Sequence, residues 1–187
     1  CRKVRCVRIR LQAAPLNIKE LRQLKILNLC DNQITEADAS HFPSVEKLYL
    51  SENKLQGVPL NIKVLRQLKI LDLADNQINE VDASHFPSVE QLGLSRNRLQ
   101  AVPLNIKELR QLKILNLCGN QIRDIDASLF RSVKKLYLSA NKPQVVPLNI
   151  KELRQLKILD LGDNQIKEVD ASHFPSNEKL YVSRTRL

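Results

Sequence analysis

Apolar positions along the chain follow one short pattern that recurs from end to end. Residues 24–34 fit the frame LxxLxLxxNxL with Ile at the last position, and residues 45–55 fit it again with Val at the first position. The central LxL alternates apolar and polar side chains with a period of two, as a strand with one buried face does. The pattern therefore predicts one short β-strand in each unit.

The frame repeats at two nested lengths. Leu24 and its counterparts lie 44 residues apart, and each 44-residue block divides into units of 21 and 23 residues. Nine frames fit the chain, the first and last imperfectly. Units this short leave no room for a full helical crossover in every return, so we expect parallel strands stacked about 4.8 Å apart. The expected fold class is an α/β repeat solenoid with short helical or 3₁₀ returns.

Two residue types recur at fixed places and are expected to be structural. Each frame Asn should be buried at the bend after its strand, where its amide satisfies backbone groups of neighbouring coils. These residues are Asn32, Asn53, Asn76, Asn97, Asn120, Asn141 and Asn164. All Phe residues share one position in the returns, which predicts a stacked aromatic spine on the convex side. They are Phe42, Phe86, Phe130 and Phe174.

The return segments have their own signals. Asp-Ala-Ser precedes the Phe in the 21-residue units and suits the capping of a short 3₁₀ turn. The segment VPLNIKELRQLK in the 23-residue units begins with Pro and continues with apolar residues at helical spacing. We expect a short helix or 3₁₀ stretch there.

The LxxLxLxxNxL frame resembles that of the leucine-rich repeat family over essentially the whole chain. The resemblance implies a horseshoe with a parallel concave sheet, and a non-catalytic recognition module that uses this face and no cofactor. The alternating unit lengths, the phrase LYLSENKLQGVP and a partial N-terminal cap in residues 1–23 are similar to extracellular members. Such members include matrix proteoglycan cores and animal innate-immune receptors. An extracellular location is therefore the expectation.

Length and composition suit one long shared core. The chain has 187 residues, of which 43% are hydrophobic, and only four Gly. We expect a single domain over 1–187, with a cap-like repeat at 1–23 and eight frames at 24–187, the last truncated. No apolar run is long enough to cross a bilayer, so membrane insertion is not expected. Without a leader or a Met, the chain is expected to be mature or trimmed, and its last frame has no Cys-rich cap.

Neither metal binding nor catalysis is predicted. His41, His85 and His173 are copies of one convex position, about 10 Å apart when two units separate them, which is too far to share one zinc ion. Carboxylate pairs occur at Asp72 with Asp75 and at Asp160 with Asp163. Neighbouring Lys residues favour a solvated acidic edge over acid and base chemistry. With no phosphate loop or nucleophile motif, we expect no enzyme.

The cysteines leave alternatives open. On one extended strand Cys1 and Cys6 would lie roughly 16 Å apart, so a bridge between them requires a hairpin. Cys30 and Cys118 share an outward position four units apart, about 19 Å, and cannot pair. Two exposed thiols allow a covalent link to a partner, although neutral drift explains them better.

Charge and aromatic residues point to the outward face of the strands. The outward frame positions account for the whole net charge of +10, with excess at the first frame and near the C-terminal end. Every Tyr of the chain occupies the central outward position of its strand, where Tyr offers large contact area at low entropy cost. The predicted ligand-binding residues are Tyr49, Tyr137, Tyr181, Lys47, Arg96, Arg98 and Lys135. The predicted ligand is a protein.

Several alternatives remain. One alternative to ligand binding is that Tyr occurs at these positions only because it favours β-strands. An acidic glycan or another polyanion could bind the basic ends. Nucleic acid is disfavoured, because Tyr spacings of about 19 Å and 10 Å do not suit stacking on successive bases. Near-identical blocks would also suit an idealised scaffold without a native ligand, but Pro143 and Asn177 at core positions favour a natural origin.

Overall fold

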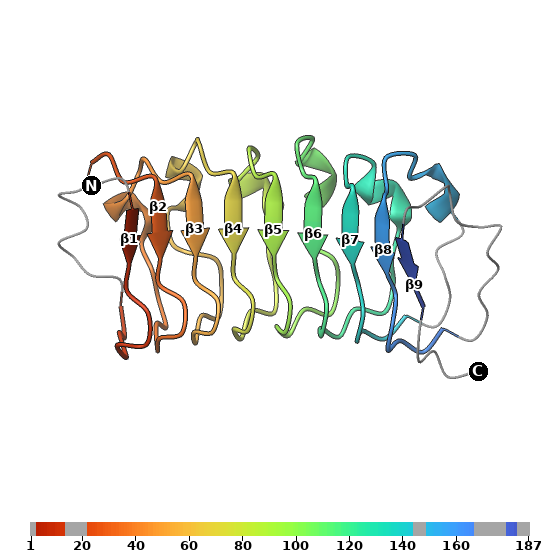
Figure 1. Cartoon of the computed structure of the whole chain (residues 1–187), viewed down its shortest axis with the longest axis horizontal. Coiled ribbons are helices and arrows are strands. Elements are labelled where there is room, and N and C mark those ends of the chain that lie inside the picture. The colour runs from red at the N-terminus through yellow and green to blue at the C-terminus, as the bar shows by residue number, and fades with distance from the viewer. Residues whose placement is uncertain (1–2, 14–21, 144–148, 167–178, 183–187) are drawn as a thin grey trace.

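The computed structural model describes residues 3–13, 22–143, 149–166 and 179–182. The strands in these segments form one parallel sheet of nine, in which spatial order follows chain order (Figure 1). They are β1 (Lys3–Arg5), β2 (Ile26–Asn28), β3 (Lys47–Tyr49), β4 (Ile70–Asp72), β5 (Gln91–Gly93), β6 (Ile114–Asn116), β7 (Lys135–Tyr137), β8 (Ile158–Asp160) and β9 (Lys179–Tyr181). The sheet, its parallel pairing and its 3₁₀ returns confirm the predicted repeat solenoid.

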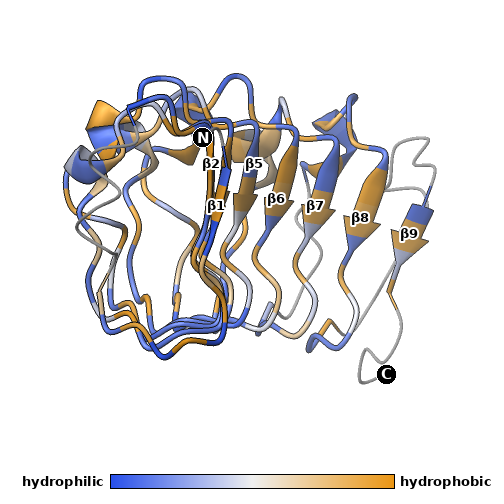
Figure 2. Cartoon of the chain, turned by 60° about the vertical axis from the view of Figure 1, so that its left-hand side comes forward, coloured by the Kyte–Doolittle hydropathy of each residue, from blue (hydrophilic) through white to orange (hydrophobic). Residues whose placement is uncertain are grey.

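Short 3₁₀ helices form the returns on the side of the coil opposite the sheet (Figure 2). They are η2 (Ala39–His41), η3 (Ile62–Val64), η4 (Ala83–His85), η5 (Ile106–Glu108), η6 (Ala127–Phe130) and η7 (Ile150–Glu152). In η2, η4 and η6 the preceding Asp accepts a hydrogen bond from the backbone N–H of the Ser two residues later. This bond is the cap expected from Asp-Ala-Ser.

One continuous apolar core runs between the sheet and the returns. In the middle of the chain Leu71 and Leu73 are fully buried. Phe42, Phe86 and Phe130 are at most 1% exposed. They fill the convex side as expected, whereas Phe174 lies outside the described residues. Because each coil packs only on its neighbours, the core is shared along the stack.

The frame Asn residues link adjacent coils. Asn76 donates to the carbonyl oxygens of Leu50, Leu73 and Ala74 at 3.0–3.1 Å, and accepts from the N–H of Leu55 at 2.9 Å. The six described members from Asn53 to Asn164 are buried. Asn32 makes a comparable set of bonds but is only half-buried, since the N-terminal coil covers it less fully.

The turn after each strand uses a left-handed residue at the position before the frame Asn, or before Ile9 in the first frame. These residues are Arg8, Asp31, Glu52, Asp75, Arg96, Gly119, Ala140 and Asp163, with φ between 51° and 66°. Only one is Gly, although the left-handed region disfavours the other types. The neighbouring coil fixes the conformation, because, for example, the N–H of Asp75 donates to the carbonyl oxygen of Ser95.

A second polar ladder crosses the convex side. Asn61 donates to Asp38 and Asn105 donates to Asp82, in each case over 3.0 Å to Oδ1. The same carboxylates cap the 3₁₀ turns, and these bonds lower the pKa of Asp38 and of Asp82 to about 2, the Asn bond being the main cause. The Asp cap therefore ties each short unit to the following long unit.

Candidate ligand-binding face

Two rows of side chains cross the outer face of the sheet in strict register. The third frame position alternates Ile with longer polar residues, as in Ile26, Lys47 and Ile70. The fifth position reads Arg5, Asn28, Tyr49, Asp72, Gly93, Asn116, Tyr137, Asp160 and Tyr181 from β1 to β9. These two rows define the candidate face, which therefore combines apolar, aromatic, polar and charged side chains.

Lys and Tyr share this face on three strands. Lys47 and Tyr49 lie two residues apart on β3, and Lys135 and Tyr137 do so on β7. Side chains two residues apart on a strand project to the same side. These four residues are half-buried, whereas Tyr181 on β9 is 48% exposed. The structure therefore brings Lys47 to Tyr49 and Lys135 to Tyr137, but leaves Tyr181 at the end of the sheet.

The short polar side chains at the fifth position of the 21-residue units accept hydrogen bonds from the backbone. Asn28, Asp72, Asn116 and Asp160 each accept a hydrogen bond from the N–H two residues later, over 3.0–3.1 Å. Each bond closes a turn at the end of the strand. The sequence patterns did not reveal this role, although Asx at one repeated position is its signal. Asp72 and Asp160 are thus structural groups as well as surface charges.

Asp72 also shapes the middle of the face. A Cβ on Gly93 would lie 2.7 Å from Asp72 Oδ1, so the carboxylate covers the site where sister units carry Tyr. Burial raises the pKa of Asp72, and repulsion by Asp75 raises it further, while the bond from the Ala74 N–H opposes them. Burial, followed by the Asp72 charge, raises the pKa of Tyr49. Tyr49 therefore remains a neutral hydroxyl beside a carboxylate.

The predicted Arg residues lie beyond the strand rather than on it. Arg96 is exposed in the left-handed turn after β5, and its Nη1 lies 3.5 Å from Asp75 Oδ1. Arg98 is exposed as well, and its backbone N–H donates to the carbonyl oxygen of Ile78. The fold places both Arg residues at the edge where the strands end, separate from the Lys and Tyr pairs.

The cysteines differ from expectation. Cys30 and Cys118 are half-buried, and each sulfur accepts a hydrogen bond from a Ser hydroxyl, Ser51 and Ser139, over 3.0 Å. The prediction of exposed thiols is wrong, because the neighbouring coil covers them. Burial raises the pKa of both thiols, which disfavours the reactive thiolate. Cys1 lies outside the described residues.

The convex His residues do not form a metal site in the described segments. His85 is exposed on η4, and its Nε2 lies 4.0 Å from Asp82 Oδ2. His41 is half-buried on η2. His173 lies outside the described residues. Within those residues no group of three metal-ligating side chains is assembled. No helix found there has both the length and the apolar character to cross a bilayer.

Comparison with known proteins decides the family. The profile of the leucine rich repeat family matches residues 22–78, 43–99, 87–142 and 110–166, which together cover most of the chain. The chain belongs to the leucine-rich repeat family. Domains of this family typically serve in protein interaction and are typically not catalytic. No curated protein matches the sequence.

Two solved structures show the same solenoid. A leucine-rich repeat protein of Leptospira interrogans is 30% identical, with a TM-score of 0.84 over 95% of this chain and 48% of its own. The functional domain of InlJ from Listeria monocytogenes, described as including a cysteine ladder, is 22% identical, with a TM-score of 0.74 over 100% of this chain and 45% of its own. The chain spans about half the length of these proteins. The second likeness concerns the fold alone.

Proposed function

We propose that the chain is a non-catalytic recognition module that binds a protein ligand through the candidate face. The observation that carries the proposal is the Lys-x-Tyr pair on β3 and β7, repeated on β9 as Lys179 and Tyr181. A rigid strand holds each pair on one side, so little entropy is lost when a partner orders them.

The surroundings of the pairs favour a protein partner. Lys47 lies in register between Ile26 and Ile70, and Lys135 lies between Ile114 and Ile158. Aromatic and apolar area next to scattered charge is the composition of protein interfaces. Asp72 and Asp160 are the carboxylates of this face in the described segments. Each accepts a hydrogen bond from the backbone at a strand end, which is a structural role rather than a catalytic one.

An alanine scan of the candidate face at two salt concentrations tests the proposal, using a partner recovered from the native source. Replacement of Tyr49 or Tyr137 should weaken binding by about 2 kcal/mol or more, because truncation removes a buried anchor. Replacement of Lys47 or Lys135 should mainly slow association and flatten its salt dependence. His85→Ala on the convex side is the control and should change nothing. Losses that map to η4 rather than to the strands would refute the choice of face.

We propose further that the module acts outside the cell, as in matrix or innate-immune members of the family. Support comes from the alternating unit lengths and the cap-like first repeat. An antibody against the chain should label intact, unpermeabilised cells or their secretions from the native source. Labelling only after permeabilisation would overturn this location.

A further inference from the structure

A row of charged side chains runs along the edge of the sheet where the strands begin. Its members hold the second position of successive frames: Lys25, Glu46, Lys69, Glu90, Lys113, Lys134 and Lys157. They are neighbours in space, because each backbone N–H from Glu46 onward donates to the carbonyl oxygen of the preceding member over 2.8–2.9 Å. Base and acid alternate as far as Lys113, which is followed by Lys134 and Lys157, so that three Lys stand side by side.

Alternation matches each acid with a base. Lys25 Nζ lies 2.9 Å from Glu46 Oε1, and Lys113 pairs with Glu90. Hydrogen bonds from Lys25 and Lys113 are the main cause of the lowered pKa of Glu46 and Glu90, respectively. Lys134 stands where this pattern would place a third Glu. Like charges at neighbouring positions repel, so Lys134 is repelled by the Lys residues on either side, whereas a Glu there would be attracted to them.

A second column changes in the same unit. Three residues before each row member lies an Arg in the alternate units, as at Arg66 and Arg110, or a Pro, as at Pro43 and Pro87. Arg131 replaces the Pro in the unit of Lys134. Three adjacent units therefore present the same Arg and Lys pair, and together they form a cationic array: Arg110 with Lys113, Arg131 with Lys134, and Arg154 with Lys157.

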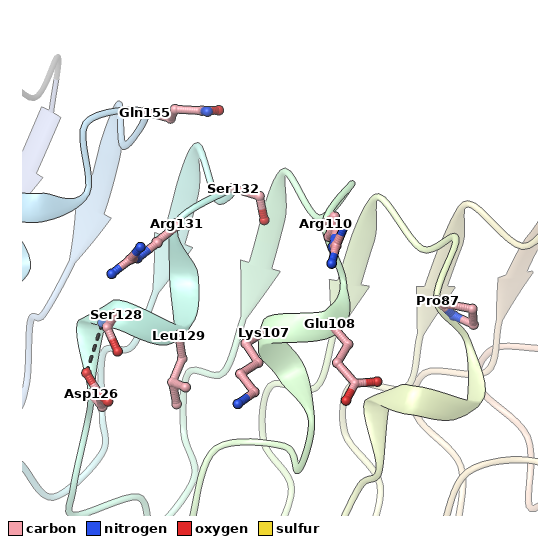
Figure 3. Close-up of a pocket in the computed structure, with 10 residues that line it drawn as sticks. All are labelled: Pro87, Lys107, Glu108, Arg110, Asp126, Ser128, Leu129, Arg131, Ser132 and Gln155. Atoms are coloured by element: carbon pink, nitrogen blue, oxygen red, sulfur yellow. Dashed lines mark hydrogen bonds between the residues drawn. The ribbon is translucent and has the colours of Figure 1, made fainter.

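The array is open to solvent. All six side chains are exposed. Arg110 and Arg131 line one hollow of about 1030 Å³ (Figure 3), and Arg131 and Arg154 line a second of about 670 Å³. Arg131 Nη2 lies 3.8 Å from Glu152 Oε2. Among the described residues no carboxylate lies within ion-pair distance of Arg110, Lys134 or Arg154.

We infer that the cationic array binds a linear sulfated glycan, at a site separate from the candidate face. Three Arg and Lys pairs recur at intervals of about 4.8 Å, so they can follow a chain of regularly spaced anions. Arg offers paired donors that suit an oxyanion, and Lys adds a point charge. Bound sulfates would also relieve the repulsion within the row.

Other polyanions fit less well. The apolar residues that line the first hollow are Leu129 and Pro87, and the described residues that line the second are all polar or charged. A protein interface of ordinary strength needs buried apolar or aromatic anchors. Single-stranded nucleic acid needs aromatic platforms for its bases, and none of the described residues that line either hollow is aromatic.

Isothermal titration with a size-defined heparin oligosaccharide tests the inference. Lys134→Glu restores the alternation, so it should fold normally and weaken binding roughly tenfold or more, because a contact turns repulsive. Lys54→Glu makes the same change of net charge at an exposed position outside the array. It should weaken binding less than about twofold, since distant surface charges are screened. Equal losses would show that only the overall charge matters and would overturn the site.

A gain-of-function variant provides an independent check. Pro43→Arg combined with Glu46→Lys copies the array into the first block, beside Lys25 and Lys69. The number of oligosaccharides bound should double, and unchanged stoichiometry in a folded variant would contradict the inference. Poly-glutamate and a single-stranded oligonucleotide are the competing probes. Tighter binding of either one than of heparin would reject a sulfated glycan. None of these results depends on the Tyr residues of the candidate face.

Discussion

Replacement of Asn76 by Ala should destabilise the solenoid far more than the same replacement of Asn32. Asn76 makes four hydrogen bonds, to Leu50, Leu73, Ala74 and Leu55, in a buried setting. Its loss leaves the buried N–H of Leu55 without a partner, whereas the carbonyl oxygen of Leu50 keeps a hydrogen bond from Asn53. One unsatisfied buried donor costs about 1–3 kcal/mol and each of the other lost hydrogen bonds about 0.5–1.5 kcal/mol, so we expect a total of about 3–5 kcal/mol.

Comparison of Asn76 with Asn32 separates the effect of solvent exposure from that of the hydrogen bonds themselves. Asn32 donates to Cys6, Leu29 and Cys30 and accepts from Ile9 and Leu11, a set at least as large. Its coil is half-exposed, so water can replace the lost bonds, and we expect a cost of about 1–2 kcal/mol. Equilibrium urea unfolding followed by far-UV circular dichroism measures both values. Equal costs, or a smaller cost at Asn76, would refute the argument that desolvation gives the ladder its strength.

Three further changes test packing, backbone and charge. Leu73→Ala should cost about 2–5 kcal/mol of unfolding free energy in urea, and Val182→Ala in the last described coil should cost clearly less. Ala140→Gly should stabilise by about 0.5–1 kcal/mol in the same assay, because φ is 53° there, and a loss would refute strain. Asp82 has its pKa lowered to about 2, chiefly by Asn105, so its contribution is complete above the unfolded pKa of about 4. Stability curves of wild type and Asp82→Ala should converge between pH 4 and 2, and parallel curves would contradict this linkage.

Much of the fold follows from the repeat itself. The LxL alternation fixes which face of β4 is buried, and the short units force parallel neighbours, so Leu71 and Leu73 could be placed in advance. Asn76 could be assigned because a buried amide at a bend must find partners. The placement of Lys47 and Tyr49 on the same side of one strand also follows from periodicity alone. Whether those residues contact a ligand stays a prediction.

Other features depend on contacts between coils. The left-handed turn carries Asp75, Arg96 or Ala140 in different units, so no single residue type marks it in the sequence. Asp82 and Asn105 are 23 residues apart and meet only once the coils are in register. The half-burial of Cys30 comes from the coil that carries Ser51. Local propensity contains none of this information, because the neighbouring coil supplies the partner atoms.

Site-specific photo-crosslinking tests the central claim most directly. A photoreactive phenylalanine analogue is placed at Tyr137 on the candidate face or at His85 on the convex side, and each protein is irradiated in extract of the native source. Recognition through the sheet predicts a saturable adduct from position 137 only. Excess wild-type chain should compete for it, whereas the Tyr49→Ala, Tyr137→Ala double variant should not. A saturable adduct from position 85, with none from position 137, would contradict the account.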